Sequence, residues 1–213
     1  MKDYQRQFLE FAIDCEVLRF GEFTLKSGRR SPYFFNMGLF DSGERIARLG
    51  EYYAAALVDA KLNIDMLYGP AYKGIPLVVS TTIALANKHQ RDTPFAFNRK
   101  EKKDHGEGGI IVGADLEGRV LIVDDVISAG TSVRESITLI EANKATPAGV
   151  LIALDRQERG TGSRSAIQEL NEQGIEVHAI VTLNDLCDYL TERGDHEKTL
   201  AGIREYQNQY GVK

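Results

Sequence analysis

The chain has little cysteine and no long apolar run, and both absences limit what it can be. Its two cysteines, Cys15 and Cys187, are far apart, and neither has a second Cys or a His at metal-ligand spacing. This pattern argues against a zinc site and is typical of a reducing compartment. No apolar stretch approaches the ~18 residues of a membrane span, and residues 1–7 are too polar for a signal peptide. We therefore expect a cytoplasmic protein with no membrane partner.

An excess of positive charge is absent as well. The formal net charge is −5 over 213 residues, so the chain has no general attraction to nucleic acid and we expect no nucleic-acid partner. A positive site for an anionic substrate must therefore be built locally. A chain of this length fits one domain with appendages, since it should bury roughly 70% of its unfolded surface without a disulfide or a metal.

Helical and extended segments alternate along most of the chain. An N-terminal stretch has helical spacing up to Leu18, and extended pieces over 18–36, broken at glycine and proline, indicate a cap. From Ser42 onward the alternation predicts right-handed crossovers and a parallel sheet with helices on both faces. The predicted helices are 42–60, 75–89, 131–144, 163–173, 184–193 and 197–210, and the predicted strands are 65–68, 95–99, 119–124, 148–155 and 176–183. We expect one domain over 1–213, with a cap over about 1–40, a core over about 41–185 and C-terminal helices over about 184–213.

The most informative segment is Val120–Ser132, which joins a buried strand to two carboxylates and a tight turn. Asp124 and Asp125 fall at the carboxyl end of the strand, where open α/β sheets bind ligands. Gly130 allows the backbone to approach an anion, and the helix that starts near Thr131 points its free N–H groups at the same place. A phosphate fits the turn, and the carboxylates suit vicinal sugar hydroxyls or a cation that holds them. Taken separately, such acid pairs also occur in receiver domains and Mg²⁺ sites, and the turn is also typical of an ordinary capped helix.

A second strand-to-helix loop, Gly69–Gly74, presents glycines and a cation. Its glycine spacing imitates a Walker phosphate loop, but that motif ends in Gly-Lys followed by Ser or Thr, and here Ile75 and Pro76 follow the last glycine. No Gly-x-Gly-x-x-Gly follows any predicted strand, so a dinucleotide site is excluded as well. Lys73 lies inside the loop, which indicates a second anion site. A structural turn with a solvated lysine is the alternative.

The segment from Arg99 to Gly109 carries four fixed positive charges, a histidine and three glycines. A charged, glycine-rich loop beside a phosphate site is typical of a lid that closes over a leaving group. Glu101, Asp104 and Glu107 also allow a plain interpretation as a solvated basic loop. The two other anion sites favour the lid.

The Val120–Ser132 segment resembles the signature with which type I phosphoribosyltransferases bind 5-phosphoribosyl 1-diphosphate (PRPP). Together with Lys26–Asn36 and Arg99–His105, it resembles the orotate phosphoribosyltransferase family, from about residue 20 to the C-terminus. The resemblance implies a Rossmann-like α/β core with a parallel sheet, helices on both faces and a small N-terminal hood. It also implies a homodimeric enzyme that makes orotidine 5′-monophosphate and pyrophosphate from orotate and PRPP with Mg²⁺. Ser128 stands where many relatives have Thr, and it keeps the hydroxyl.

The same resemblance implies roles for individual residues. Near the base it places Lys26, Arg156 and the Phe34–Phe35 pair, although pattern alone favours plain strand residues for the two phenylalanines. The residues implied to hold PRPP through the ribose and the 5-phosphate are Asp124, Asp125, Val126, Ile127, Ser128, Ala129, Gly130, Thr131 and Ser132. Those implied at the pyrophosphate are Tyr72, Lys73, Arg99, Lys100, Lys103 and His105. The Ala71–Tyr72 peptide bond is implied to be cis.

Catalysis is expected from Lys103, His105, Asp124 and Asp125. Since orotate is already anionic, no strong base is needed, and the barrier lies in expelling pyrophosphate from a carbon that gains oxocarbenium character. We expect Mg²⁺ to be held mainly by PRPP and water near the two aspartates, with no protein ligand assigned. In the family the 99–109 lid closes over the partner subunit's site, so each site of the homodimer would combine residues of both chains.

Three other functions share part of this pattern. A phosphoribosyltransferase for another base would keep the turn but lack the Lys26–Asn36 segment. A PRPP-sensing regulator would keep the turn, lose the lid cations and normally add a nucleic-acid-binding module. A Mg²⁺-dependent phospho-acceptor domain would need further acids on an earlier strand end, and it gives no role to Thr131 and Ser132.

Overall fold

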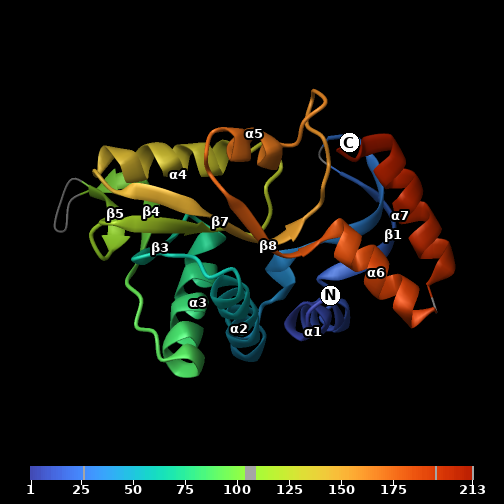
Figure 1. Cartoon of the computed structure of the whole chain (residues 1–213), viewed down its shortest axis with the longest axis horizontal. Coiled ribbons are helices and arrows are strands. Elements are labelled where there is room, and N and C mark those ends of the chain that lie inside the picture. The colour runs from blue at the N-terminus through green and yellow to red at the C-terminus, as the bar shows by residue number, and fades with distance from the viewer. Residues whose placement is uncertain (26, 104–108, 195, 213) are drawn as a thin grey trace.

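The computed structural model describes residues 1–25, 27–103, 109–194 and 196–212, except for the side chains of residues 102 and 103. Figure 1 shows the main sheet between layers of helices, with a smaller sheet toward one end of the molecule. Among the described residues, no helix combines the length and the hydropathy of a membrane span. The elements in chain order are α1 (Asp3–Asp14), β1 (Leu18–Thr24), β2 (Arg30–Phe35), η1 (Met37–Leu39), α2 (Gly43–Asp59), β3 (Met66–Gly69), α3 (Gly74–His89), β4 (Phe95–Lys103), β5 (Gly109–Gly113), β6 (Arg119–Val123), α4 (Thr131–Ala142), β7 (Thr146–Asp155), α5 (Ala166–Glu172), β8 (Val177–Thr182), α6 (Leu183–Arg193) and α7 (Glu197–Tyr210).

The main sheet of the described residues has six strands in the order β5-β4-β3-β6-β7-β8. All neighbouring pairs run parallel except β4 and β5, which pair antiparallel. Helices α2 and α3 cover one face of the sheet, and α4 and α5 cover the other (Figure 1). The predicted α/β core with helices on both faces is confirmed, and β5 is an antiparallel edge strand that the sequence pattern did not predict.

Strand β6 lies at the centre of the sheet and is buried on both faces. Leu121 and Val123 belong to the hydrophobic cluster under α2 and α3, whereas Val120 and Ile122 belong to the cluster under α4. This is why the strand reads as a continuous apolar run with no polar face. Strands β3 and β7 pair with β6 on its two sides. This pairing fixes the position of the carboxyl end of β6, and therefore of Asp124 and Asp125, which follow it.

The N-terminal hood is the antiparallel pair of β1 and β2. Phe8 of α1 packs on Phe35 of β2 with ring centroids 6.4 Å apart. Tyr33 of β2 meets Tyr206 of α7 edge to face, with centroids 6.3 Å apart. Helices from both ends of the chain therefore hold the hood against the rest of the protein.

The helical spacing of the N-terminal stretch continues past the helix itself, whereas the extended pieces predicted from residue 18 begin where β1 begins. Helix α1 ends at Asp14, and Leu18 is instead the first residue of β1. Glu16 adopts a left-handed backbone conformation with φ of 56°, which a right-handed helix does not continue through. Leu18 is apolar because it is a buried residue of a strand. Its agreement with the helical spacing is therefore a coincidence.

The segment predicted as a lid loop over 99–109 is partly a strand. Strand β4 runs on to Lys103, and Gly109 pairs antiparallel with that residue, so the stretch is the arm of a β-hairpin. The register shifts between Asn98 and Lys103, which marks an irregularity at the base of the arm. Strand β4 pairs with β3 only over residues 95–97, so beyond them the arm pairs with β5 alone. Charged residues do not interrupt the arm because this part of it remains partly in water. Residues 104–108, which include His105, lie outside the described residues.

Candidate active site

Asp124 and Asp125 follow the last residue of β6 and are both buried. The Asp124 N–H donates to the Leu151 carbonyl of β7 (3.1 Å), so the strand geometry extends to this residue. The Asp124 carboxylate accepts hydrogen bonds from the Asp125 N–H (2.8 Å) and from the Ser132 hydroxyl (3.4 Å). The Tyr53 hydroxyl of α2 donates to the Asp124 carbonyl (2.8 Å). The carboxylate pair is therefore oriented by bonds to the backbone and to both neighbouring helices.

The environment of Asp124 opposes its ionisation. Burial, and after it the charge of Asp125, raise the pKa of Asp124 to about 6. The hydrogen bonds from the Asp125 N–H and Ser132 and the charge of Lys73 act in the opposite direction. A buried carboxylate of this kind is suited to a ligand that donates hydrogen bonds or brings a cation.

The turn after the two aspartates presents a row of backbone donors. Within the described residues, none of the backbone N–H groups of 128–132 donates to an acceptor of the protein. Gly130 has a left-handed backbone with φ of 74°, and a Cβ there would lie 2.9 Å from a guanidinium nitrogen. Helix α4 begins at Thr131, and the positive end of its dipole adds to these donors. Val126 and Ile127 pack their side chains against the two hydrophobic clusters, so their backbone is the part available to a ligand.

The Gly69–Gly74 loop folds tightly on itself between β3 and α3. A Cβ on Gly69 would lie 2.2 Å from the Gly74 carbonyl oxygen, so only glycine fits there. The Ala71–Tyr72 peptide bond is cis, as the family resemblance predicts. Asn98 of β4 accepts a hydrogen bond from the Ala71 N–H (2.8 Å) and ties the loop to the neighbouring strand.

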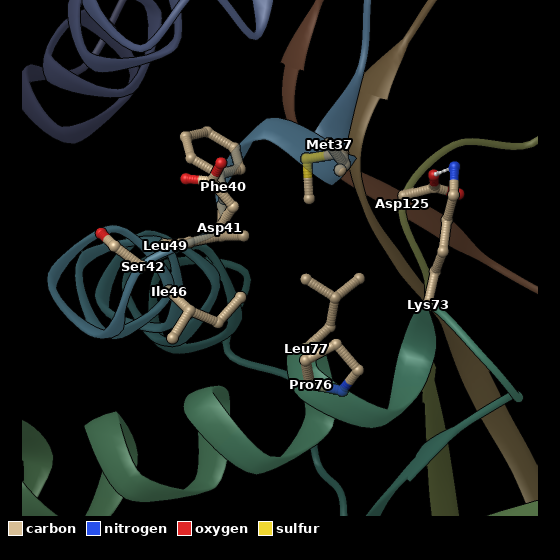
Figure 2. A pocket seen from close by; sticks show the side chains of 11 residues that line it. Met37, Phe40, Asp41, Ser42, Ile46, Leu49, Lys73, Pro76, Leu77 and Asp125 are labelled. Carbon is tan, nitrogen blue, oxygen red and sulfur yellow. Dashed lines mark hydrogen bonds and ion pairs between the residues drawn. The ribbon is translucent and has the colours of Figure 1, made fainter.

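Lys73 brings this loop into contact with the carboxylate pair. Its Nζ lies 2.5 Å from Asp125 Oδ2, and its side chain is 62% exposed whereas that of Asp125 is 10% exposed. Figure 2 shows Lys73 reaching from the start of α3 to Asp125. Because β3 and β6 are neighbours in the sheet, the loops at their carboxyl ends form one site.

A pocket of ≈ 390 Å³ adjoins this ion pair. Lys73 and Asp125 lie on one side of it, and apolar side chains from the segment after the hood, from α2 and from α3 lie on the other (Figure 2). These apolar side chains are Met37, Phe40, Ile46, Leu49, Pro76 and Leu77. Since Met37 comes shortly after β2, the pocket links the hood to the carboxylate pair.

The chain is similar to known proteins over its whole length. Residues 39–179 match the family model described as a phosphoribosyl transferase domain. An orotate phosphoribosyltransferase from Cronobacter sakazakii is 61% identical over 213 residues, which are 100% of both chains, and one from Vibrio cholerae is 59% identical with the same coverage. The chain belongs to the orotate phosphoribosyltransferase family. A solved orotate phosphoribosyltransferase from Francisella tularensis, 42% identical, matches with a TM-score of 0.89 over 97% of this chain and 100% of that one.

In this member of the orotate phosphoribosyltransferase family, the two phenylalanines expected at the base are half-buried in β2. Phe34 stacks on Phe23 with centroids 5.4 Å apart, and Phe35 packs against Phe8 of α1. Both rings thus have structural partners, as the plain interpretation of the strand pattern suggested.

Arg156 follows the last residue of β7 and lies at the same edge of the sheet as the carboxylate pair, because β7 pairs with β6. Its Nε donates to Glu158 (2.7 Å). Its guanidinium lies over the Tyr33 ring of the hood, 4.8 Å from the centroid. Lys26, the other cation expected near the base, lies outside the described residues.

The residues expected at the pyrophosphate are described in part. Tyr72 is 66% exposed, and Lys100 Nζ lies 4.8 Å from the centroid of its ring. Arg99 and Lys100 belong to β4, the neighbour of β3. The backbone of Lys103 ends β4, but its side chain and the whole of His105 lie outside the described residues. Their catalytic roles therefore stay predictions.

Three residues that support the site were not predicted from the sequence. Tyr53 bonds to the backbone of the carboxylate pair, and Asn98 holds the Gly69–Gly74 loop. Arg134 Nη1 donates to the Ala129 carbonyl (2.7 Å) while its Nη2 donates to Glu169 (2.7 Å). Only Arg134 had a local signal, since it lies in the first turn of the helix that follows the phosphate-type turn.

The described residues contain no group of three or more side chains that could hold a metal ion. At this site the protein offers the carboxylates of Asp124 and Asp125, whereas Mg²⁺ prefers six oxygen ligands and keeps several waters. The donor set fits a Mg²⁺ ion that takes most of its ligands from phosphate oxygens and water.

Proposed function

We propose that this chain transfers the ribose 5-phosphate group of PRPP to orotate and releases orotidine 5′-monophosphate and pyrophosphate, a step of pyrimidine biosynthesis. One observation carries the proposal: a buried carboxylate pair is followed, after Val126 and Ile127, by five backbone N–H groups, those of residues 128–132, that have no acceptor among the described residues of the protein. A phosphorylated sugar needs both kinds of partner, since its phosphate accepts hydrogen bonds and its hydroxyls donate them. We choose orotate as the base in this proposal because the relatives of 61% and 59% identity are orotate phosphoribosyltransferases.

In this proposal PRPP binds at three places. The N–H groups of 128–132 hold the 5-phosphate, and Asp124 and Asp125 accept hydrogen bonds from the ribose hydroxyls. Tyr72 and Lys73 contact the pyrophosphate from the loop that begins at Gly69. Lys73 can exchange its ion pair with Asp125 for a contact with the pyrophosphate, because the lysine side chain of this ion pair is exposed.

Catalysis is electrostatic in this mechanism. The anionic ring nitrogen of orotate forms a bond to the anomeric carbon, and the bond from that carbon to pyrophosphate breaks with its electron pair leaving on the pyrophosphate oxygen. Asp124 and Asp125 stabilise the positive charge that develops on the carbon. The cations around the leaving oxygens are Lys73, Arg99, Lys100, Lys103 and His105. Mg²⁺, when bound, neutralises part of the pyrophosphate charge.

The base occupies the space between the hood and the end of β7. In this assignment the backbone at Phe34 and Phe35 frames the ring, and Arg156 and Lys26 supply positive charge. Because the two phenylalanine rings already pack against Phe23 and Phe8, they hold the backbone in position.

We also infer that the enzyme works as a homodimer in which the 99–109 lid of one chain covers the site of the other. Within one chain, Lys100 lies over its own Tyr72, so the part of the lid that crosses to the partner begins beyond this contact. The cytoplasmic location and the division into hood, core and C-terminal helices stay predictions.

The reaction is tested by mixing the protein with orotate, PRPP and Mg²⁺ and following the loss of orotate absorbance. We expect turnover that depends on both substrates. Replacing orotate by uracil or by a purine base tests the choice of base, and efficient use of one of these instead would contradict it. Tight binding of PRPP without turnover would favour a PRPP-sensing regulator.

The shared lid is tested by mixing two damaged chains. A Lys103→Ala chain and an Asp125→Asn chain are each expected to be nearly inactive. If the lid crosses the interface, dissociation and random reassociation should restore about a quarter of wild-type sites, because half of the dimers are mixed and each has one intact site. The matched control pairs Asp125→Asn with Asp124→Asn, which damage the same half-site, and should restore nothing. No recovery in the first mixture would contradict a shared lid.

A further inference from the structure

A half-buried cluster of two arginines and one glutamate joins the hood to the loop after β7. Arg156 Nε donates to Glu158 Oε1 (2.7 Å), and Nη2 of the same guanidinium lies 2.6 Å from that oxygen as an ion pair. The other oxygen of Glu158 accepts a longer hydrogen bond from Arg29 Nη1 (3.4 Å). Arg29 precedes β2 directly, so one carboxylate connects segments that are 129 residues apart in sequence.

An aromatic ring flanks each of the two guanidinium groups of this cluster. The guanidinium of Arg156 lies 4.8 Å from the centroid of Tyr33, and that of Arg29 lies 4.9 Å from the centroid of Tyr210. The side chains of Arg156 and Glu158 are each 16% exposed. Low exposure and flanking rings restrict both side chains to few orientations, so the ion pair has a defined geometry.

The cluster has one unmatched positive charge. Arg29 and Arg156 supply two guanidinium groups, and Glu158 supplies one carboxylate. Within the described part of the chain, the one contact of Arg156 with full hydrogen-bond geometry comes from Nε, its buried Nη2 is held by the ion pair alone, and the Tyr206 hydroxyl is a further polar group beside the guanidinium. A half-buried guanidinium with few hydrogen bonds and an excess of positive charge is suited to bind an anion, and a carboxylate matches its planar shape.

Arg156 also lies between the ribose site and the hood. The Ala153 N–H of β7 donates to the Asp125 carbonyl (2.9 Å), so Arg156 comes shortly after the point where β7 meets the carboxylate pair. Under the guanidinium, Tyr33 is the residue before Phe34 in β2. An anionic group that reaches Arg156 would therefore be close to both halves of the proposed active site.

We propose that Glu158 is a positioning residue for recognition of the base. It holds the Nε side of Arg156 and links it to Arg29, which leaves the Nη1 side of Arg156 for the carboxylate of orotate. This inference rests on the proposed function, which puts the base beside Arg156. Glu158 itself touches no substrate in this role. Its contribution is orientation, because an arginine side chain without this partner would have to be ordered during binding.

The test compares Glu158→Ala and Glu158→Gln with the wild-type enzyme in assays that vary orotate and PRPP separately. We expect Glu158→Ala to raise the KM for orotate about tenfold, the scale of one charge-assisted hydrogen bond, and to change the KM for PRPP less than about twofold. Glu158→Gln keeps an oxygen that can accept from Arg156 Nε. It should therefore raise the KM for orotate only about threefold.

Two further variants separate positioning from general structural damage. In an Arg156→Ala background, Glu158→Ala should add nothing to the KM for orotate, because its effect passes through Arg156. Glu172→Gln is the matched control, since it removes an exposed ion pair with Arg164 on the segment that follows β7. Both KM values should be unchanged in this control.

An unchanged or lower KM for orotate in Glu158→Ala would overturn the inference. Equal rises for both substrates, or a full additional effect in the Arg156→Ala background, would overturn it as well. If Glu158→Ala does not fold, Glu158→Gln carries the same test, and an unchanged KM for orotate then overturns it. A wild-type protein that forms no orotidine 5′-monophosphate would instead overturn the proposed function, so the two failures are distinguishable.

Discussion

The proposed ribose-phosphate region, residues 124–132, and the proposed base region around Arg29, Arg156 and Glu158 are built in different ways. In the first, Asp124 and Ser132 are 8 residues apart and already bonded to each other, and the turn between them presents its own N–H groups. In the second, Arg29 and Glu158 are 129 residues apart, and rings from the hood and α7 complete the cluster. One region is a local motif at the end of a strand, whereas the other exists only when three distant segments meet.

This difference predicts different failures. A substitution in the local region should change the chemistry or the phosphate affinity with little effect elsewhere, because its partners come from the same stretch of chain. A substitution in the base region should change the affinity for orotate through the packing of the hood. The four experiments below test this contrast, from the largest expected effect to the smallest.

Asp125→Asn should lower turnover on the order of 10²–10³-fold, the usual effect of removing one preorganised charge at a reacting centre. Binding of ribose 5-phosphate should weaken far less, because the proposed partners of Asp125 are sugar hydroxyls and the phosphate donors follow it in sequence. Steady-state turnover and inhibition by ribose 5-phosphate measure the two effects. A comparable loss in both would show that the carboxylates and the turn act as one phosphate site.

Asp124 should make stability fall as the pH rises. Its pKa of about 6 in the folded protein lies above the ordinary value of 3.8, so the folded state binds the proton more tightly than the unfolded state. The free energy of unfolding should therefore decrease between about pH 4 and pH 6, by about 3 kcal/mol for a difference of two pKa units.

Asp124→Asn removes this titration. Relative to the wild type, the variant should become more stable by about that amount on going from pH 4 to pH 7, as measured by denaturant unfolding at each pH. A stability difference between the two proteins that stays constant over this range would contradict the buried ionisation. Confirmation would show that the local region keeps its charge at the expense of stability.

Gly130→Val should raise the KM for PRPP about tenfold and leave turnover at saturation nearly unchanged, the reverse of Asp125→Asn. Valine is strained at a φ of 74°, and its Cβ would meet the Arg134 guanidinium at 2.9 Å. The control is Gly162→Val, where a Cβ meets nothing within 4 Å. If both valine variants behave alike, the turn geometry is not what binds the phosphate.

Phe34→Leu should raise the KM for orotate only about threefold and leave the KM for PRPP unchanged, which is the scale of one lost aromatic pair. The ring is expected to act by stacking on Phe23. Phe23→Leu loses the same pair from the other side and should therefore give the same result. A much larger effect of Phe34→Leu than of Phe23→Leu would indicate direct contact between the Phe34 ring and the base.

Much of the fold could be predicted because its central elements have simple patterns. Strand β6 is a continuous apolar run since it is covered on both faces, and α2 begins after Ser42, whose side chain caps it. The strands at the β5 edge of the sheet were harder to predict from the sequence. Strand β5 and the outer half of β4 are partly in water, so their charged and glycine-rich sequence resembled a loop.

Within the site, the sequence alone determined the order of strand, two aspartates and glycine turn, because each step depends on neighbours in the chain. Only the tertiary structure decided that Lys73 meets Asp125, since this requires β3 to pair with β6. It likewise decided that Glu158 lies between Arg156 and Arg29. Contacts of this kind depend on which strands become neighbours and which helices cover the hood, and the packing of the whole chain sets both.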